Sequence, residues 1–310
     1  MAGDRASPQA IATWNTVAPC RRATCSRPSP ATGVWLPPRA KNGMNAMPAA
    51  TRRPGPGTSS HDRRPGGRSG PVISAASMPG MSDPVPSPTL PPVILVHGFA
   101  SSSEHNWVRP GWRDALESRG HQVVLMDLPG HGGNASSGGG LAAVGQLTEL
   151  AGSFPVVDLV GFSAGARACA LAAASGQVPV RRLVLAGLGD GSLAGADRGS
   201  DQGAMSMTGP LDEADIRGRL FRRMAATAGN DPSALEAFLA APAGDLTPEV
   251  LARIARPTLL IIGERDHLGP ADRLAASLPD SELVTLPRID HFATTGRLEA
   301  IMATLRFLAA

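Results

Sequence analysis

The chain has 310 residues, of which 42% are hydrophobic and 18% are charged, and its formal net charge is +3. Its three cysteines form neither a disulfide framework nor a metal-ligand spacing, which favours a reducing compartment, so we expect a cytoplasmic protein. No apolar run has the length of a membrane span, so we expect no membrane association.

Residues 1–90 form a leader whose composition differs from that of the rest. It holds 11 of the 29 Lys and Arg residues but 3 of the 26 acidic ones, which leaves 18 basic and 23 acidic residues in the remainder. Richness in Pro, Gly, Ser and Arg without apolar periodicity predicts disorder. The arginine runs have no interleaved aromatic residues, so we expect no nucleic-acid partner. We favour a leader without function, with Met78 or Met81 as the true start; organelle targeting and a binding tail are the alternatives.

Residues 91–310 alternate short apolar runs with helix-like stretches, as expected of one α/β domain. The expected strands are 93–96, 122–127, 156–160, 182–187, 258–263 and 282–286. The expected helices are 107–120, 141–150, 166–174 and 298–308. This order predicts right-handed crossovers and a mostly parallel sheet with helices on both faces. The chemistry of such a sheet lies at the carboxyl ends of its strands.

The alternation breaks between residues 190 and 256. Residues 212–228 and 233–240 look helical, and a third helix is expected to start at Thr247-Pro248-Glu249. That start has a capping hydroxyl, a proline at the first helical position and an early acid. An insertion of this length between two strands predicts a small helical cap over the substrate site.

The most informative stretch is the junction at Gly161-Phe162-Ser163-Ala164-Gly165, which follows the apolar run 156–160. This Gly-x-Ser-x-Gly form is typical of a nucleophile elbow, a tight strand-to-helix turn that presents a serine hydroxyl above a sheet. The alanine-rich stretch 166–174 follows at once, as a helix after the elbow requires. Ser163 is therefore the candidate nucleophile.

Several motifs of residues 91–310 occur in an order that resembles the α/β-hydrolase superfamily. They are His97-Gly98-Phe99, Asp127-Leu128-Pro129-Gly130-His131-Gly132, the 161–165 elbow, Gly263-Glu264-Arg265-Asp266 and Asp290-His291-Phe292. The resemblance implies that family's fold. It departs in one respect, because the antiparallel strand pair that usually precedes the His-Gly strand has only 72–75 as a faint candidate. We therefore expect a shortened sheet of about six strands.

A serine hydroxyl is not ionised at neutral pH, so Ser163 needs a histidine that takes its proton. The resemblance puts this base in the loop after the last strand, where His291 lies, and His131 is the second candidate. His97 fits a structural position in the loop after its strand. His267 lies beside the candidate acid and is expected to point elsewhere.

The acid that orients the base is expected at Asp266, just past the 258–263 strand. The order Ser163, Asp266, His291 matches the chain order of the family. Asp190 is the alternative, because some relatives place the acid after the preceding strand.

The developing oxyanion needs preorganised backbone N–H donors. Ala164, directly after the nucleophile, supplies one at a helix N-terminus, where the dipole also favours negative charge. The resemblance implies Phe99 as the other. The rings of Phe99 and Phe162 are candidates for an apolar acyl pocket, although core packing explains them equally well.

These residues predict a serine hydrolase that cleaves a carboxylic ester, thioester or lactone of a small-molecule acyl substrate through an acyl-enzyme. No metal or organic cofactor is implied. An acyltransferase or perhydrolase, a carbon–carbon bond hydrolase and a weakly catalytic ligand-binding receptor are the alternatives. The oligomeric state is left open.

Overall fold

The computed structural model describes residues 90–196, 205–210 and 215–310, all within one compact unit, Met78–Ala310. Residues 1–89 of the predicted leader, with both candidate start methionines and the 72–75 segment, lie outside the described residues. The division into leader, domain and cap therefore stays a prediction. None of the described helices combines the length and apolar character that a bilayer crossing requires.

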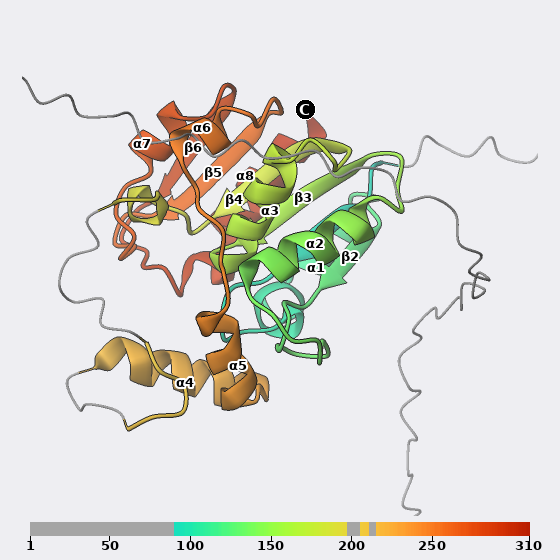
Figure 1. Cartoon of the computed structure of the whole chain (residues 1–310). Coiled ribbons are helices and arrows are strands. Elements are labelled where there is room, and N and C mark those ends of the chain that lie inside the picture. Colours follow the sequence, from blue (N-terminus) through green and yellow to red (C-terminus); the bar gives the residue numbers. More distant parts are fainter. Residues whose placement is uncertain (1–89, 197–204, 211–214) are drawn as a thin grey trace, which may run out of the picture. The chain divides into compact units, whose positions relative to one another are not determined.

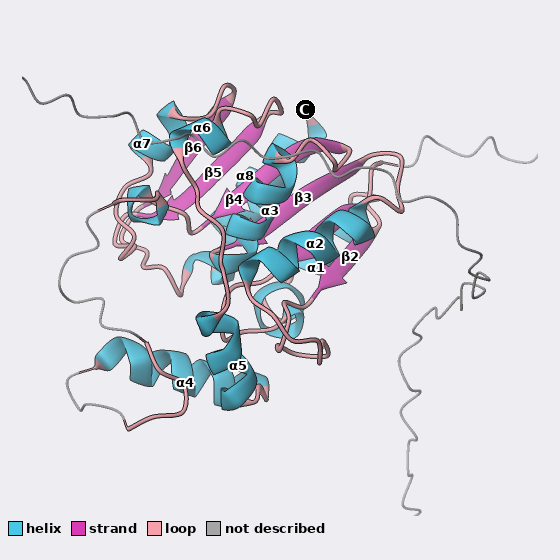
Figure 2. Ribbon diagram, viewed as in Figure 1, coloured by secondary structure: helices cyan, strands magenta, loops and turns pink. Residues whose placement is uncertain are grey.

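The described strands form one parallel sheet of six strands in the order β2-β1-β3-β4-β5-β6, which confirms the predicted sheet (Figure 2). The strands are β1 Val93–Val96, β2 Val123–Met126, β3 Val157–Phe162, β4 Val180–Ala186, β5 Thr258–Gly263 and β6 Ser281–Leu286. Because all neighbours run parallel, the carboxyl ends of the strands share one edge of the sheet.

Helices cover both faces of the sheet. Successive strand residues point to opposite sides, so each strand can contribute side chains to a core on each face. Ile94 and Val96 of β1 join the core under α2 Gly140–Ala151 and α3 Ala164–Ala174, whereas Val93 and Leu95 join the core under α1 Trp112–Glu117 and α8 Leu298–Ala309. Figure 1 shows α2 and α3 side by side along the strands. Their alanines allow close packing, and Cys169 of α3 is a buried free thiol.

The helix expected at 107–120 is split into two elements. A π-helical turn, η1 Glu104–Val108, is followed by α1, and between them Gly111 has a φ of 89°. The preceding Pro110 lacks the backbone N–H that a continuous helix needs. Trp107 and Trp112 are fully buried with ring centroids 5.1 Å apart, as expected of residues that pack this first helical region.

The described part of the segment between β4 and β5 contains several helical elements. The elements are η2 Asp190–Ser192, α4 Ile216–Ala228, α5 Pro232–Ala240 and α6 Pro248–Leu251. Residues 212–214 of the helix expected at 212–228 lie outside the described part. In Figure 1, α4 and α5 lie together beyond one end of the sheet.

The predicted start of α6 is confirmed, since the Thr247 hydroxyl accepts a hydrogen bond from the Val250 N–H (3.3 Å). The helix ends after one turn, six residues before Pro257 leads the chain into β5. Two further elements, α7 Asp272–Ala276 and η3 Thr294–Gly296, are too short for an apolar period to reveal them.

Candidate active site

The turn between β3 and α3 forces Ser163 into a rare backbone conformation, with φ 53° and ψ −112°. Both flanking glycines are needed for it. A Cβ atom on Gly161 would lie 2.5 Å from the Cα atom of Ala166, and one on Gly165 would lie 2.2 Å from the carbonyl oxygen of Val96. The two glycines of the predicted elbow are thus a steric requirement of this junction. Backbone strain of the kind seen at Ser163 is characteristic of functional sites.

The three side chains of the predicted triad meet at the carboxyl edge of the sheet. Ser163 Oγ lies 3.1 Å from His291 Nε2, and His291 Nδ1 lies 2.8 Å from Asp266 Oδ2. The other oxygen of Asp266 accepts a hydrogen bond from the Leu268 N–H (2.9 Å). With Nδ1–H donated to the carboxylate, Nε2 carries the lone pair that faces the serine hydroxyl. The arrangement can move a proton from Ser163 to His291.

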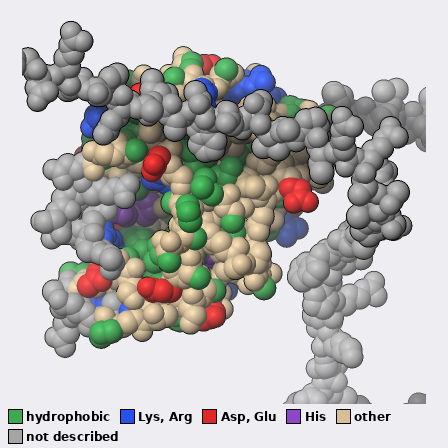
Figure 3. Space-filling view, in the orientation of Figure 1, with side chains coloured by type: hydrophobic (Ala, Val, Ile, Leu, Met, Phe, Trp, Pro, Cys, Tyr) green, Lys and Arg blue, Asp and Glu red, His purple; other side chains and the backbone are tan. Residues whose placement is uncertain are grey.

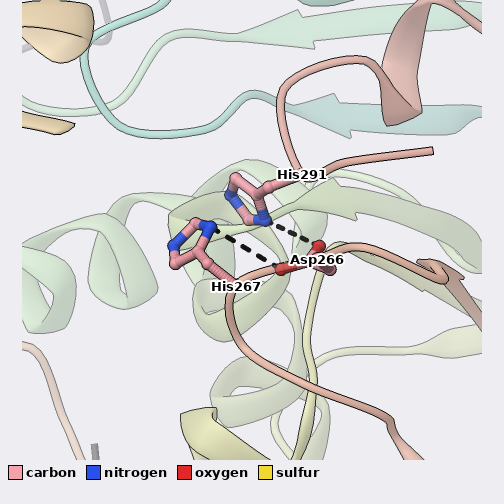
Figure 4. A group of neighbouring side chains, drawn as sticks. All are labelled: Asp266, His267 and His291. Atoms are coloured by element: carbon pink, nitrogen blue, oxygen red, sulfur yellow. Dashed lines mark hydrogen bonds and ion pairs between the residues drawn. The ribbon is translucent and has the colours of Figure 1, made fainter. Parts of the chain in front are cut away.

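His267 does not point elsewhere, contrary to expectation. Its ring centroid lies 4.5 Å from that of His291, and its Nδ1 lies 3.8 Å from Asp266 Oδ1 (Figure 4). Burial and the neighbouring His291 lower the pKa of His267, so its ring is neutral at pH 7. A turn at Asp266, whose carboxylate accepts from the Leu268 N–H, precedes this contact. Chain position alone does not reveal that the rings of His267 and His291 pack together.

Asp266, His267 and His291 are also the side chains here that could hold a metal ion, since their ligand atoms all lie within 4.8 Å of one another (Figure 4). Each of the two histidines offers one ring nitrogen to such a site. An ion bound through Nδ1 of His291 would replace the hydrogen bond to Asp266, so metal binding and the proton relay compete for the same atoms.

The two alternative candidates have other partners. The carboxylate of Asp190 accepts hydrogen bonds from the Leu274 N–H (2.9 Å) and the Arg273 N–H (3.3 Å), which holds the first turn of α7. His131 Nε2 accepts from the Ala100 N–H (3.0 Å), and its Nδ1 lies 2.8 Å from the Pro129 carbonyl oxygen. Burial lowers the pKa of His131 to about 4. Both residues therefore serve backbone segments.

The loop after β1 is held by several side chains. Asn106 Oδ1 accepts from the Gly98 N–H (3.0 Å), His97 Nε2 accepts from the Leu128 N–H (3.0 Å), and Ala100 has a φ of 59°. Within the described part of the chain, the backbone N–H groups of Phe99 and Ala164 have no hydrogen-bond partner. These are the two groups predicted as oxyanion donors, and their role stays a prediction.

Asn230, at the junction of α4 and α5, is a contributor that the sequence did not reveal. It is 8% exposed, its Nδ2 donates to the Ser101 carbonyl oxygen (2.9 Å), and its Oδ1 accepts from the Gly132 N–H (2.8 Å). One side chain thus joins the loop after β1 to the loop after β2. The Gly-Asn-Asp sequence signals a turn between helices but not the distant backbone partners.

The two candidate pocket rings lie in different surroundings. The Phe99 ring lies 5.6 Å from that of Phe221 in α4 and 5.8 Å from that of Phe238 in α5. Phe162 is 3% exposed, and its ring centroid lies 5.0 Å from that of His291. Substrate contact by either ring stays a prediction. Figure 3 shows a hollow in which histidine side chains are visible beside hydrophobic ones.

Comparison with known proteins assigns the chain to a family. Residues 93–301, about two thirds of the chain, match the model of the alpha/beta hydrolase family. The chain belongs to the alpha/beta hydrolase family. The resemblance, the fold and the assignment to a family of hydrolase enzymes are therefore confirmed.

Among curated alpha/beta hydrolase relatives, the chain is 29% identical over 247 residues to pimeloyl-[acyl-carrier protein] methyl ester esterase of Xanthomonas campestris pv. campestris, covering 71% of this chain and 96% of the relative. It is 30% identical over 244 residues to 2-succinyl-6-hydroxy-2,4-cyclohexadiene-1-carboxylate synthase of Escherichia coli, covering 70% and 93%.

Solved structures share the fold. A hydrolase from Pseudomonas aeruginosa PA01 superposes with a TM-score of 0.56 at 24% identity, over 72% of this chain and 92% of that one. The enol-lactonase from Burkholderia xenovorans LB400 gives a TM-score of 0.57 at 18% identity, over 71% and 92%.

Proposed function

We propose that this protein is a serine hydrolase that cleaves a carboxylic ester, thioester or lactone of a small-molecule acyl substrate. The observation that carries the proposal is the hydrogen-bonded series of Ser163, His291 and Asp266 behind a strained elbow. The curated relative that is a methyl ester esterase supports ester cleavage. We also place the enzyme in the cytoplasm, which rests on its cysteine usage, including the free Cys169.

In the proposed mechanism, Ser163 Oγ attacks the acyl carbon while His291 Nε2 takes its proton. The Asp266 carboxylate holds the His291 tautomer and stabilises the imidazolium that forms. The N–H groups of Phe99 and Ala164 bind the oxyanion, and each such donor typically lowers the barrier by about 3 kcal/mol. His291 then protonates the leaving alcohol or thiol, and an attacking water repeats the sequence to release the acid and restore Ser163. The reaction needs no metal or organic cofactor.

We further propose that the helices within residues 190–256 act as the cap of this site. Support comes from the contacts of the Phe99 ring with Phe221 and Phe238. These contacts put α4 and α5 next to a proposed oxyanion donor, so substrate bound there is shielded from water.

The proposal is tested with 4-nitrophenyl butyrate as substrate and Ser163→Ala as the variant. We expect kcat/KM to fall at least about a thousandfold, because the nucleophile is lost while binding remains. The matched control is Ser175→Ala, at the other end of α3, where the hydroxyl donates to the Ala172 carbonyl oxygen and accepts from the Gln177 N–H. Equal activity of Ser163→Ala and the wild type would overturn the proposal.

A further inference from the structure

A cavity of about 420 Å³ lies beside Phe292, the residue that follows the proposed base. Its walls come from the loop after β1 and η1, from the segment of Phe292 and η3, and from α4, and we call it the α4 pocket. The residues that matter here are Ser101, His105, Leu220, Arg223, Met224 and Phe292. Its volume falls in the range of small-molecule sites, about 300–1,000 Å³.

The α4 pocket adjoins both halves of the proposed machinery. Phe292 follows the proposed base directly, and its ring centroid lies 5.4 Å from that of His291. Ser101 lies two residues after Phe99, the proposed oxyanion donor. A group bound in this pocket therefore lies close to the proposed base and to the loop that carries a proposed oxyanion donor.

The walls are mainly apolar but include a single charged side chain, Arg223. Arg223 is an exposed side chain, and within the described part of the chain no carboxylate forms an ion pair with it. Glu104, next to His105 in the sequence, is paired with Arg109 (3.3 Å). A guanidinium that faces a cavity without an acidic partner provides a forked donor for an oxyanion.

His105 supplies a second polar group. Its Nε2 is buried and has no hydrogen-bond partner in the described residues, while its Nδ1 lies 2.9 Å from Ser102 Oγ. Ser102 Oγ accepts a hydrogen bond from the His105 backbone N–H. The hydroxyl proton of Ser102 is therefore free to be donated to His105 Nδ1. We assign the ring proton of His105 to Nε2 on this basis. Burial lowers the pKa of His105, so this ring is a neutral donor at pH 7. A buried donor without a protein acceptor costs free energy until an acceptor reaches it, and His105 is one of the residues that line this cavity.

We propose that the α4 pocket binds a carboxylate carried by the substrate, with Arg223 as its charged partner and His105 as a second donor. The inference rests on the proposed function and narrows its substrate class to esters that combine an apolar segment with a carboxylate. One guanidinium and one neutral N–H match the two oxygens and single charge of a carboxylate, and Leu220, Met224 and Phe292 suit the apolar segment.

The test compares matched esters with and without the carboxylate. For the acyl side, the pair is 4-nitrophenyl hexanoate and mono-4-nitrophenyl adipate; for the alcohol side, it is phenyl butyrate and 3-carboxyphenyl butyrate. We expect the wild type to favour the carboxylated member of one pair by at least about tenfold in kcat/KM. Arg223→Gln should remove that preference by raising KM for the carboxylated ester.

Arg219→Gln is the matched control, because Arg219 is an exposed arginine of the same helix that does not line the pocket. The preference of Arg219→Gln for the carboxylated ester should equal that of the wild type. This control distinguishes a local contact with Arg223 from an effect of the net charge of α4. Hydrolysis of neutral esters without an Arg223-dependent preference in either pair would overturn this inference alone. If the protein hydrolyses none of the four esters, the proposed function is overturned.

Discussion

His131 is a buried imidazole whose two nitrogens both bond to backbone groups. It holds the Ala100 N–H while Ala100 has a left-handed φ of 59°, so it stabilises a conformation that alanine rarely adopts. Its ring also packs against that of Phe238 in α5, at 5.0 Å between centroids. His131 therefore supports the loop that presents the Phe99 N–H, without being a base itself.

We expect His131 to make the protein's stability depend on pH. Burial, together with the nearby His97, lowers the pKa of His131 from 6.5 to about 4 in the folded protein. Between these values the unfolded chain binds a proton that the folded chain excludes, so the free energy of unfolding falls as pH falls. The loss between pH 7 and pH 4 is roughly 3 kcal/mol.

His131→Gln tests this, because glutamine keeps an acceptor for the Ala100 N–H but has no titrating group. Urea unfolding measured at pH 7.5, 6, 5 and 4.5 should show a shallower decline in the variant than in the wild type. Some decline remains, since burial also lowers the pKa of His97. Parallel declines in the two proteins would contradict the assignment.

At the scale of elements, two side chains connect the helices between β4 and β5 to the body of the domain. Asn230 joins the α4–α5 junction to the loops after β1 and β2. Arg167 of α3 donates to the carbonyl oxygens of Ser192 and Gly244, both at 3.0 Å. Because Ser192 and Gly244 lie near the two ends of the insertion, Arg167 ties both of its connections to the helix that follows the nucleophile.

Asn230→Ala should destabilise the protein by about 1–3 kcal/mol. The substitution leaves two backbone groups without their partner, the carbonyl oxygen of buried Ser101 and the N–H of Gly132. The variant should also lower kcat between about tenfold and a hundredfold, since the loop that carries Phe99 is no longer held in position by the bond to Ser101. Asn230→Asp keeps an acceptor for Gly132 N–H but loses the donor to Ser101, so it separates the two bonds. Thermal unfolding and ester kinetics are the measurements, with exposed Ser233→Ala as the control. Wild-type values for both variants would refute a positioning role.

For the molecule as a whole, the parallel sheet explains why so much could be predicted from sequence. The six strands were evident as apolar runs, and in a parallel sheet the ends of β3, β5 and β6 share an edge. Ser163, Asp266 and His291 follow those three strands, so chain order predicted a meeting that the hydrogen bonds now display.

The remainder depends on contacts that leave no periodic trace in the chain. The split at Gly111 and the single-turn α6 follow from local backbone chemistry that competes with apolar periodicity. The bonds of Asn230 join segments 98 and 129 residues apart. The Nε2 of His105, which has no partner among the described residues, belongs to a residue of a cavity wall. Residue type alone indicates neither the partner nor its absence.

The central claim, that Ser163 is an activated nucleophile, is tested most directly by mass spectrometry after treatment with a fluorophosphonate. This reagent forms a covalent adduct with a serine whose hydroxyl has a neighbouring base. We predict one adduct per chain, mapped to the peptide with Ser163, loss of ester hydrolysis in step with labelling, and no adduct in Ser163→Ala. A folded, ester-hydrolysing protein that stays unlabelled, or that is labelled at another serine, would contradict the account.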